Sequence, residues 1–201
     1  MSSRRPVVIG YHLVWTAYGT WLPNDPRGSG SRAVLTPGLA GLGAVHFGRK
    51  RQQPPPRELR EFYERAAPRL TYPLIGFDAA QRAAIAAAFH EQVEHLPLTC
   101  WACAVMPDHV HLVVRKHRLR AEEMIARLQQ AARLLLQQGG LAPSDHPVWT
   151  RGGWRVFLDS PSAGQLRGGY VQRNPVKAGL APQPWAFVRH YDGWPLRAAP
   201  G

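Results

Sequence analysis

Two apolar runs that meet at a Pro-Asp pair constrain the fold of this chain more than any other feature. Residues 98–106 and 109–116 are dominated by apolar and β-branched side chains, and Pro107 and Asp108 separate them. Proline presets the backbone angle φ that a turn requires, and aspartate can bond the backbone beside it. The two runs therefore predict a pair of antiparallel strands joined by a tight turn.

Helical patterns precede and follow this hairpin. Asp78 is a suitable N-cap for the alanine-rich segment behind it, whose apolar residues recur at helical spacing up to about residue 95. Ser160 followed by Pro161 is the usual start of a helix, and this helix carries Tyr170. The expected elements are strands over 7–16, 98–106, 109–116 and 154–158, and helices over 57–67, 79–95, 119–138 and 160–174.

The order of these elements predicts the fold class. Without the helix at 57–67, the core reads β-α-β-β-α-β, which is the order of the ferredoxin-like fold. We therefore expect an α+β protein with an antiparallel sheet and helices on one face, plus a C-terminal helix carrying the tyrosine Tyr170. The other face of the sheet is expected to be left free, and the histidines of the 109–116 strand would point there.

A long segment after the first strand differs in character from the rest of the chain. Residues 18–72 are an insertion in the predicted core, and up to Pro56 they are rich in Pro, Gly and Arg. A stretch of this length within a compact domain is usually a functional or disordered insertion. A chain of 201 residues suits one domain. We therefore expect a single domain over 1–201 with an insertion at about 18–72.

The charge of the chain limits the choice of partner. Lys and Arg number 25 against 13 Asp and Glu, and the formal net charge is +12. Such an excess favours a polyanion, because basic residues placed on phosphates release condensed counterions. A generally basic, arginine-rich composition is the alternative. No apolar run reaches membrane-spanning length, and the start of the chain lacks the pattern of a secretory signal, so we expect a cytoplasmic protein with no membrane partner.

The two cysteines form a C-x-x-C pair at Cys100 and Cys103. A zinc site would need a second pair or histidine partners at suitable spacing, and a redox motif should open a helix. These cysteines lie in a predicted strand, where positions i and i+3 face opposite ways. We therefore expect two ordinary core thiols and no disulfide.

His109 and His111 are the first candidates for chemistry. On a strand, positions i and i+2 share one face and lie about 6.5–7 Å apart along the chain, so a single cation can bridge the two imidazoles. A single histidine in a strand is more often a structural residue. Two on one face, entered through a Pro-Asp turn, leave a metal site and a structural role equally open.

Tyr170 and Asn174 are the second pair of candidates. At helical spacing i and i+4 they lie about 6 Å apart on one face and present a phenol and an amide oxygen to the same place. The alternative is a packing tyrosine and a polar residue that precedes Pro175 at the helix end. Gly168 and Gly169 each weaken the helix by about 1 kcal/mol relative to alanine, which would let the tyrosine move.

Together these motifs resemble those of a known family. Met-Pro-Asp-His-Val-His-Leu-Val at 106–113 and Tyr-Val-Gln-Arg-Asn-Pro-Val-Lys-Ala-Gly-Leu at 170–180 are similar to the single-tyrosine HUH transposases, and closest to the REP-associated tyrosine transposases. The resemblance covers 7–17 and about 76–195. Two features depart from it: the paired glycines before Tyr170, and an insertion at 18–72 that is longer than the minimal family core.

The resemblance implies a metal-dependent single-stranded DNA endonuclease and strand-transferase that acts on hairpin-containing DNA through a 5′-phosphotyrosine. His109 and His111 would bind a divalent metal, Asn174 would complete the metal site, and Tyr170 would attack the scissile phosphate. The family implies Mg²⁺ or Mn²⁺, although imidazoles suit Zn, Cu, Fe or Ni better than Mg. A non-catalytic or domesticated protein that binds single-stranded or hairpin DNA is the alternative.

The DNA-binding residues and the oligomeric state are predicted less directly. Unpaired bases stack on exposed aromatic side chains, but the sequence does not select which ones. The tail from Trp185 to Trp194 is expected to pack onto the body of the protein, which acts as a monomer or a homodimer. The basic residues expected on phosphates are Arg115, Lys116, Arg118 and Arg120 after the histidine strand, and Arg151, Arg155, Arg173 and Lys177 around the tyrosine.

Overall fold

The computed structural model describes residues 7–34 and 36–195, which form two compact units. The first unit contains the residues up to Trp15, Phe77–Asp145 and the residues from Arg151 onward. The second contains Thr16–Gly76 and His146–Thr150. The predicted insertion at 18–72 therefore lies within the second unit. Among the described residues, no helix is both long and apolar enough to cross a membrane.

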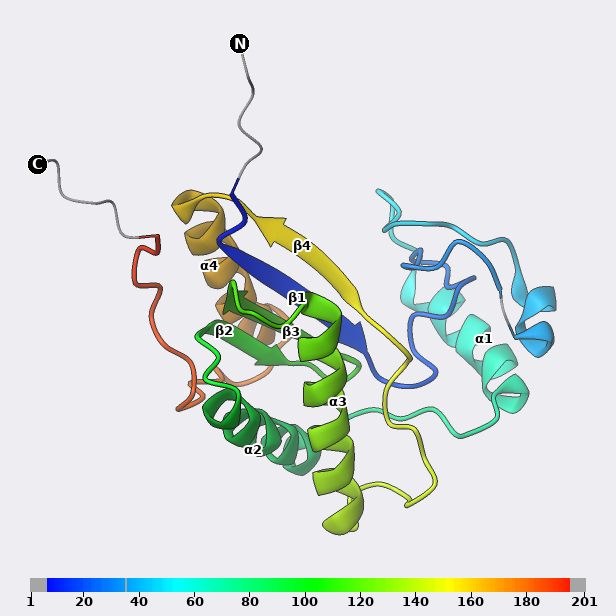
Figure 1. Cartoon of the computed structure of the whole chain (residues 1–201). Helices are drawn as coiled ribbons and strands as arrows, with labels where there is room; N and C mark the ends of the chain where they lie inside the picture. Colours follow the sequence, from blue (N-terminus) through cyan, green and yellow to red (C-terminus); the bar gives the residue numbers. More distant parts are fainter. Residues whose placement is uncertain (1–6, 35, 196–201) are drawn as a thin grey trace, which may run out of the picture. The chain divides into compact units, whose positions relative to one another are not determined.

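An antiparallel sheet forms the centre of the first unit (Figure 1). Its strands lie in the order β2-β3-β1-β4, and β2–β3 and β1–β4 are antiparallel pairs. This confirms the α+β class and the predicted antiparallel sheet. The strands are β1 (Gly10–Thr16), β2 (Cys100–Val105), β3 (His109–Arg115) and β4 (Trp154–Leu158).

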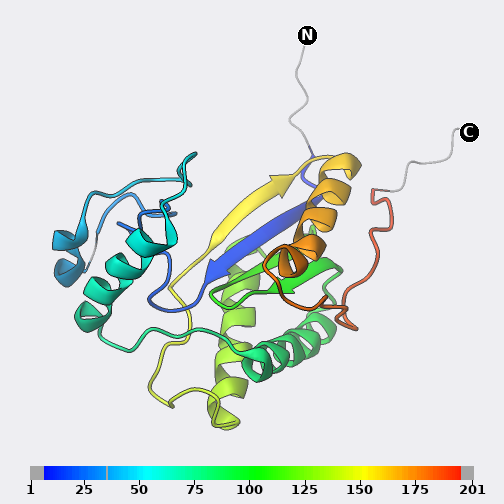
Figure 2. The ribbon, with the colours of Figure 1, turned by 180° about the vertical axis from the view of Figure 1, so that it is seen from behind.

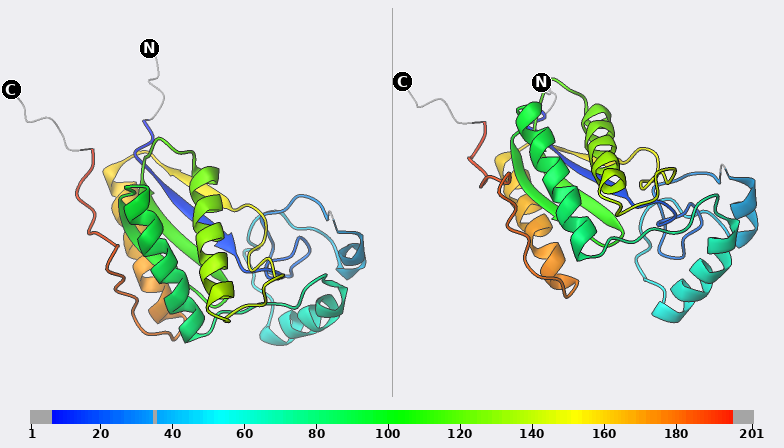
Figure 3. Two further views of the ribbon diagram at one scale, coloured as in Figure 1. Left: turned by 60° about the horizontal axis from the view of Figure 1, so that its bottom comes forward. Right: turned by 90° about the horizontal axis from the view of Figure 1, so that it is seen from below.

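Helices lie on both faces of this sheet. Helices α2 (Ala79–His95) and α3 (Ala121–Gln138) pack against each other on one face, as predicted. Helix α4 (Pro161–Lys177), which carries Tyr170, lies on the other face (Figures 2 and 3). The expectation of a free second face is therefore wrong. An apolar cluster beneath α4 explains the difference, because β2 and β3 bury side chains on both faces.

Helix α2 begins where its sequence predicts. The Asp78 carboxylate accepts a hydrogen bond from the Gln81 backbone N–H at 2.8 Å, and the Gln81 side chain accepts one from the Asp78 backbone N–H at 2.8 Å. This reciprocal pair satisfies two N–H groups that have no partner within the helix. Because both partners are local in sequence, the helix start is encoded locally.

Both cysteines are core residues, as expected. Cys100 and Cys103 are buried and free, on a strand whose six residues are all buried. Burial raises the pKa of the Cys100 thiol to about 12, so the thiolate is scarcely populated at neutral pH. Since the thiolate is the reactive and metal-binding form, this burial supports a structural role.

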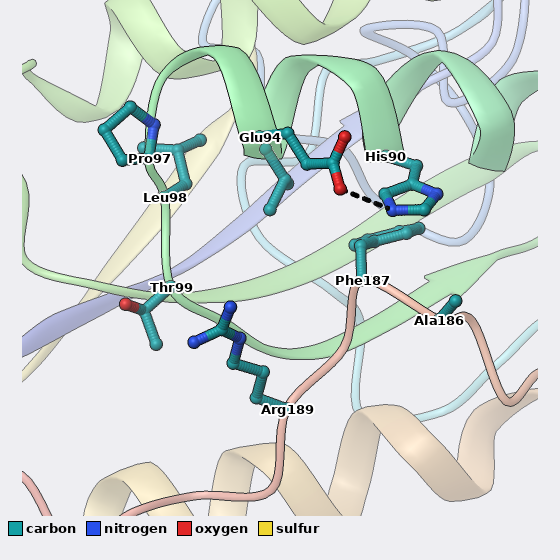
Figure 4. Close-up of a pocket in the computed structure, with 9 residues that line it drawn as sticks. His90, Glu94, Pro97, Leu98, Thr99, Ala186, Phe187 and Arg189 are labelled. Carbon is teal, nitrogen blue, oxygen red and sulfur yellow. Dashed lines mark ion pairs between the residues drawn. The ribbon is translucent and has the colours of Figure 1, made fainter.

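The C-terminal tail packs against the first unit. Val188 forms a bridge with Cys100 at the edge of β2, and Tyr191 packs edge-on against Trp101 with ring centroids 4.7 Å apart. A cavity of about 470 Å³ lies between the tail and α2 (Figure 4). There His90 pairs with Glu94 at 3.2 Å and stacks on Phe187.

The second unit has its own small core. Its elements are the 3₁₀ helix η1 (Pro37–Leu42), helix α1 (Pro56–Ala66) and the 3₁₀ helix η2 (Ala67–Arg69). Only α1 was expected from the sequence. The core consists of Leu22, Leu39, Leu42, Phe62 and Ala66. Much of the Pro/Gly/Arg-rich segment is therefore folded.

A buried carboxylate organises this second unit. Asp25 is 1% exposed and accepts hydrogen bonds from Arg27 Nε at 3.0 Å, Arg27 Nη2 at 2.8 Å and Tyr63 Oη at 2.5 Å. Burial and the Asp25 charge raise the pKa of Tyr63, which therefore stays a phenol donor. The Arg27 guanidinium also lies 3.7 Å from the centre of the Trp21 ring. One side chain thus holds a loop onto α1.

Replacing Asp25→Asn is expected to destabilise the second unit by about 2–3 kcal/mol, because the amide cannot match the charge-assisted bonds of the carboxylate. Urea unfolding followed by tryptophan fluorescence measures the change. Glu61→Gln is the matched control, since its pair with Arg57 is exposed at 53% and 84% and should contribute below about 1 kcal/mol. Equal effects of the two substitutions would refute the structural role of Asp25.

Candidate active site

Three imidazoles and a carboxylate form a row across β1 and β3. His12 Nε2 lies 3.0 Å from His111 Nδ1, and His111 Nε2 lies 3.0 Å from His109 Nε2. His109 Nδ1 lies 2.5 Å from Asp108 Oδ1. His109 and His111 share a face because they are two residues apart on one strand. His12 joins them because β1 and β3 are neighbours in the sheet.

The Asp108 carboxylate at one end of the row fixes which imidazole nitrogens carry protons. A carboxylate only accepts, so His109 Nδ1–H donates to Asp108 and His109 Nε2 keeps its lone pair. His111 Nε2–H then donates to His109 Nε2, and His12 Nε2–H donates to His111 Nδ1. All three rings are neutral in this scheme.

Burial keeps the inner imidazoles neutral. It lowers the pKa of His12 to about 4, with a smaller contribution from the Arg167 charge. Burial, and then the neighbouring His109 and His12 rings, lower the pKa of His111 to about 2. Neutral imidazole is the form that binds metals. His111 can therefore become a ligand without net loss of a proton, once its proton moves from Nε2 to Nδ1 and is donated to His12 Nε2.

The geometry of His109 and His111 fits a divalent cation. Their Nε2 atoms are 3.0 Å apart, and two ligands at about 2.1 Å from an ion and about 90° apart have that same separation. Each ring has its Nδ1 engaged, by Asp108 in one case and by His12 in the other. Such partners commonly orient metal-binding histidines. A hydrogen bond between two neutral imidazoles accounts for the same distance.

The protein supplies few further ligands. Residues 7–34 and 36–195 contain no group of three or more His, Cys, Asp or Glu side chains able to hold a metal. Asn174, the predicted third ligand, lies half-buried on α4, and no hydrogen bond joins its side chain to either imidazole in the part of the chain that is described. A cation at His109 and His111 would therefore take oxygen ligands from phosphate, water or a repositioned Asn174.

Tyr170 lies beside the histidine row. Its ring centroid is 5.9 Å from that of His111 and 6.3 Å from that of His12, and it meets both rings edge-on. The ring also packs against the apolar cluster beneath α4, whose member Val171 is fully buried. The structure thus brings together a phenol and two imidazoles that are far apart in sequence. Their catalytic roles stay predictions.

Local features of α4 hold the tyrosine in place. The Ser160 side chain accepts a hydrogen bond from the Ala163 backbone N–H at 3.3 Å and caps the helix, as predicted. Gly164 lets Tyr191 approach the helix, since a Cβ there would lie 2.9 Å from the tyrosine ring. The pair Gly168 and Gly169 does not interrupt the helix.

Two glycines of α4, four residues apart, should respond to alanine in opposite ways. Gly168→Ala should raise the unfolding free energy of the first unit by about 1 kcal/mol, because no atom lies within 4 Å of the added methyl group and alanine favours the helix. Gly164→Ala should lower it by about 1–3 kcal/mol, because the methyl group collides with Tyr191. Thermal unfolding of both variants tests this, and shifts of the same sign would contradict the packing.

Two site residues were missed by sequence reasoning. His12 lies within the strand predicted over 7–16, but nothing in the sequence links it to His111, 99 residues away. Arg167 is half-buried on α4, three residues before Tyr170, and its charge lowers the pKa of both His12 and His111. No ion pair joins it to a carboxylate among the described residues. Its position three residues before Tyr170, which puts the two side chains on one face of a helix, could have identified it from the sequence.

The predicted phosphate-binding residues differ in how freely they can act. Arg115 is half-buried, with its guanidinium 3.4 Å from the centre of the Trp194 ring. Arg120 pairs with Glu123 at 3.4 Å and Arg155 with Glu122 at 2.6 Å. These surface pairs are weak and could be exchanged for phosphates. The remaining residues are all exposed: Lys116, Arg118, Arg151, Arg173 and Lys177.

The solved structures to which this chain is similar include two transposases. One is a REP-associated tyrosine transposase bound to a REP hairpin, with a TM-score of 0.42 and 11% identity over 90% of this chain and 76% of that one. The other is a suspected transposase from Deinococcus radiodurans R1, with a TM-score of 0.36 and 14% identity over 90% of this chain and 99% of that one. No protein-family model and no curated protein match the chain. Similarity of this degree assigns no activity.

Proposed function

We propose that this protein is a metal-dependent single-stranded DNA endonuclease and strand-transferase of the transposase type, which acts on hairpin-containing DNA. One observation carries the proposal: the Tyr170 ring lies 5.9 Å from His111, whose Nε2 faces that of His109 at 3.0 Å. A phenol beside two neutral, paired imidazoles combines a nucleophile with a ligand pair for a cation. The basic net charge of +12 suits a phosphate polymer as substrate.

Tyr170 would act as the nucleophile. Its Oη attacks the scissile phosphorus and loses its proton as the new O–P bond forms, and the bond from phosphorus to the 3′ oxygen breaks. The 3′ oxygen leaves as a hydroxyl after taking up a proton, and the 5′ phosphate stays on the tyrosine. Attack by another 3′ hydroxyl reverses the step and joins the strands. Since one phosphodiester replaces another, rejoining needs no ATP.

His109 and His111 would hold the cation, with Asn174 as a further ligand. When bound, Mg²⁺ or Mn²⁺ would polarise a phosphate oxygen and so favour attack at phosphorus. The protein's own part is orientation: Asp108 holds His109 through Nδ1, and His12 holds His111. Arg167 places a positive charge beside the same rings, where it suits a phosphate.

Covalent capture tests the proposal. The full chain is incubated with Mn²⁺ and a hairpin-bearing single strand that is labelled at its 3′ end. We expect labelled DNA to migrate with the protein after denaturation in SDS. The same strand labelled at its 5′ end should give a short free fragment whose 3′ hydroxyl a polymerase can extend. Tight, salt-sensitive binding without any adduct would instead favour a non-catalytic DNA-binding protein.

A further inference from the structure

Trp154, the first residue of β4, lies on the face of the sheet that carries the histidine row. It pairs with Val14 of β1, and Val156, two residues on, pairs with His12. Side chains alternate between the two faces of a strand, so Arg155 and Phe157 face away from Trp154. Their contacts show which face this is. Arg155 pairs with Glu122 of α3, and Phe157 contacts Tyr11. Trp154 therefore points to the side of His12 and Tyr170.

This tryptophan remains exposed, although the other end of its strand is covered by the cluster beneath α4. Its exposed fraction is 49%, whereas Leu158 at the other end of β4 is 1% exposed within the cluster beneath α4. Helix α4 begins where β4 ends and packs mainly on β2 and β3, as Figure 2 shows. Diagonal neighbours on paired strands lie about 7–8 Å apart, so the Trp154 backbone is that close to His12.

The surroundings indicate what this indole binds. The exposed Arg151 precedes it by three residues, and the half-buried Arg167 lies beside the histidine row. Positive charge with an exposed aromatic ring is the combination that binds single-stranded nucleic acid, because phosphates meet the cations and any base can stack on the ring. A strand whose phosphate reaches Tyr170 would bring a neighbouring base over Trp154.

We propose that Trp154 is a stacking platform for the unpaired base of a nucleotide next to the phosphate that Tyr170 attacks. The inference rests on the proposed function and adds to it a base-binding subsite on β4. The face of the indole ring offers no hydrogen-bonding groups. The subsite therefore accepts any of the four bases. Its contribution is to position the strand.

Binding of two matched probes tests the stacking. One probe is a fluorescently labelled (dT)₁₂ strand, and the other is a strand of the same length with abasic residues, which keeps the phosphates and lacks the bases. Without metal, Trp154→Ala should weaken (dT)₁₂ binding by about 5- to 150-fold and leave the abasic strand unchanged. Trp154→Tyr should restore most of the loss. The slope of log K against log salt should not change, because no phosphate contact is removed.

Phe157→Ala is the matched control. Phe157 is an exposed aromatic residue of the same strand, 56% exposed, and it faces the opposite side of the sheet. Its loss should leave both probes bound as before. An equal effect of Phe157→Ala, an unchanged affinity of Trp154→Ala for (dT)₁₂, or an equal loss on the abasic strand would each overturn the proposal. Concentration-dependent dimerisation that Trp154→Ala abolishes would assign the indole to a second copy instead.

A second measurement separates this proposal from the proposed function. In covalent capture, a single abasic residue beside the cleaved bond should slow adduct formation by the wild-type protein and have no further effect on Trp154→Ala. Stacking on (dT)₁₂ with no adduct from any substrate would refute the nuclease and retain the base subsite. Adduct formation that is insensitive to Trp154→Ala would refute the subsite and retain the nuclease.

Discussion

The Tyr170→Phe variant should form no covalent adduct with hairpin DNA, a loss of at least about 10³-fold, and should bind the same DNA within about twofold of the wild-type affinity. The substitution removes the attacking oxygen. It keeps the ring that packs against the cluster beneath α4, so the fold and the DNA surface should remain. Denaturing gels of strands labelled at the 3′ end measure the adduct, and fluorescence anisotropy measures binding.

Tyr11→Phe is the control for this prediction. Tyr11 is also half-buried, but it lies on the opposite face of β1, against Phe157. This variant should retain the adduct. An adduct formed by Tyr170→Phe at the wild-type level would exclude Tyr170 as the nucleophile. Equal losses of binding and cleavage in Tyr170→Phe would make Tyr170 a structural or DNA-contacting residue.

The His111→Gln variant should lose most of its affinity for Mn²⁺, by at least about 10-fold, and form the adduct correspondingly slowly. Two imidazole nitrogens 3.0 Å apart would be the protein's principal ligands in the proposed site, and the glutamine amide cannot supply a nitrogen lone pair where His111 Nε2 lies. Electron paramagnetic resonance of free Mn²⁺ measures the affinity directly, without any DNA. His90→Gln is the control, because that imidazole is 43% exposed on α2 and pairs with Glu94.

A second variant keeps the metal prediction testable even if the buried His111 is needed for folding. Asp108 lies in the turn before β3, and its side chain is 31% exposed. Asp108→Asn should weaken Mn²⁺ binding by about 10- to 100-fold, because the partner that orients His109 loses its charge. Unchanged Mn²⁺ affinity in folded His111→Gln and Asp108→Asn proteins would remove the metal site from the proposed function.

Local sequence was sufficient to predict a structural feature where the interacting residues are close along the chain. The start of α2 follows from Asp78 and Gln81, three residues apart, and the start of α4 follows from Ser160 and Ala163. The hairpin of β2 and β3 follows from two apolar runs and the turn between them. The spacing of His109 and His111 likewise placed two imidazoles on one face before any sheet was known.

Local sequence was insufficient where the partners come from different strands or from the insertion. The composition of the second unit suggested a loop, but the unit has a small apolar core. The hydrogen bond between Asp25 and Tyr63, which stabilises it, joins residues 38 positions apart, and no local pattern predicts it. The free face expected for the sheet is covered by α4, because the face to which that helix docks depends on apolar side chains of β2 and β3 together.

The sequence by itself determined the strands, the helices, the paired histidines and the helical tyrosine, since each depends on periodicity and caps within a few residues. Only the tertiary structure decided that Tyr170 contacts His111, that His12 hydrogen-bonds to His111, and that Trp154 lies on the same face of the sheet. The physical reason is the order and register of the sheet. Pairing of β1 with β4, and its place beside β3, sets side chains more than 90 residues apart at contact distance, and no local pattern encodes that pairing.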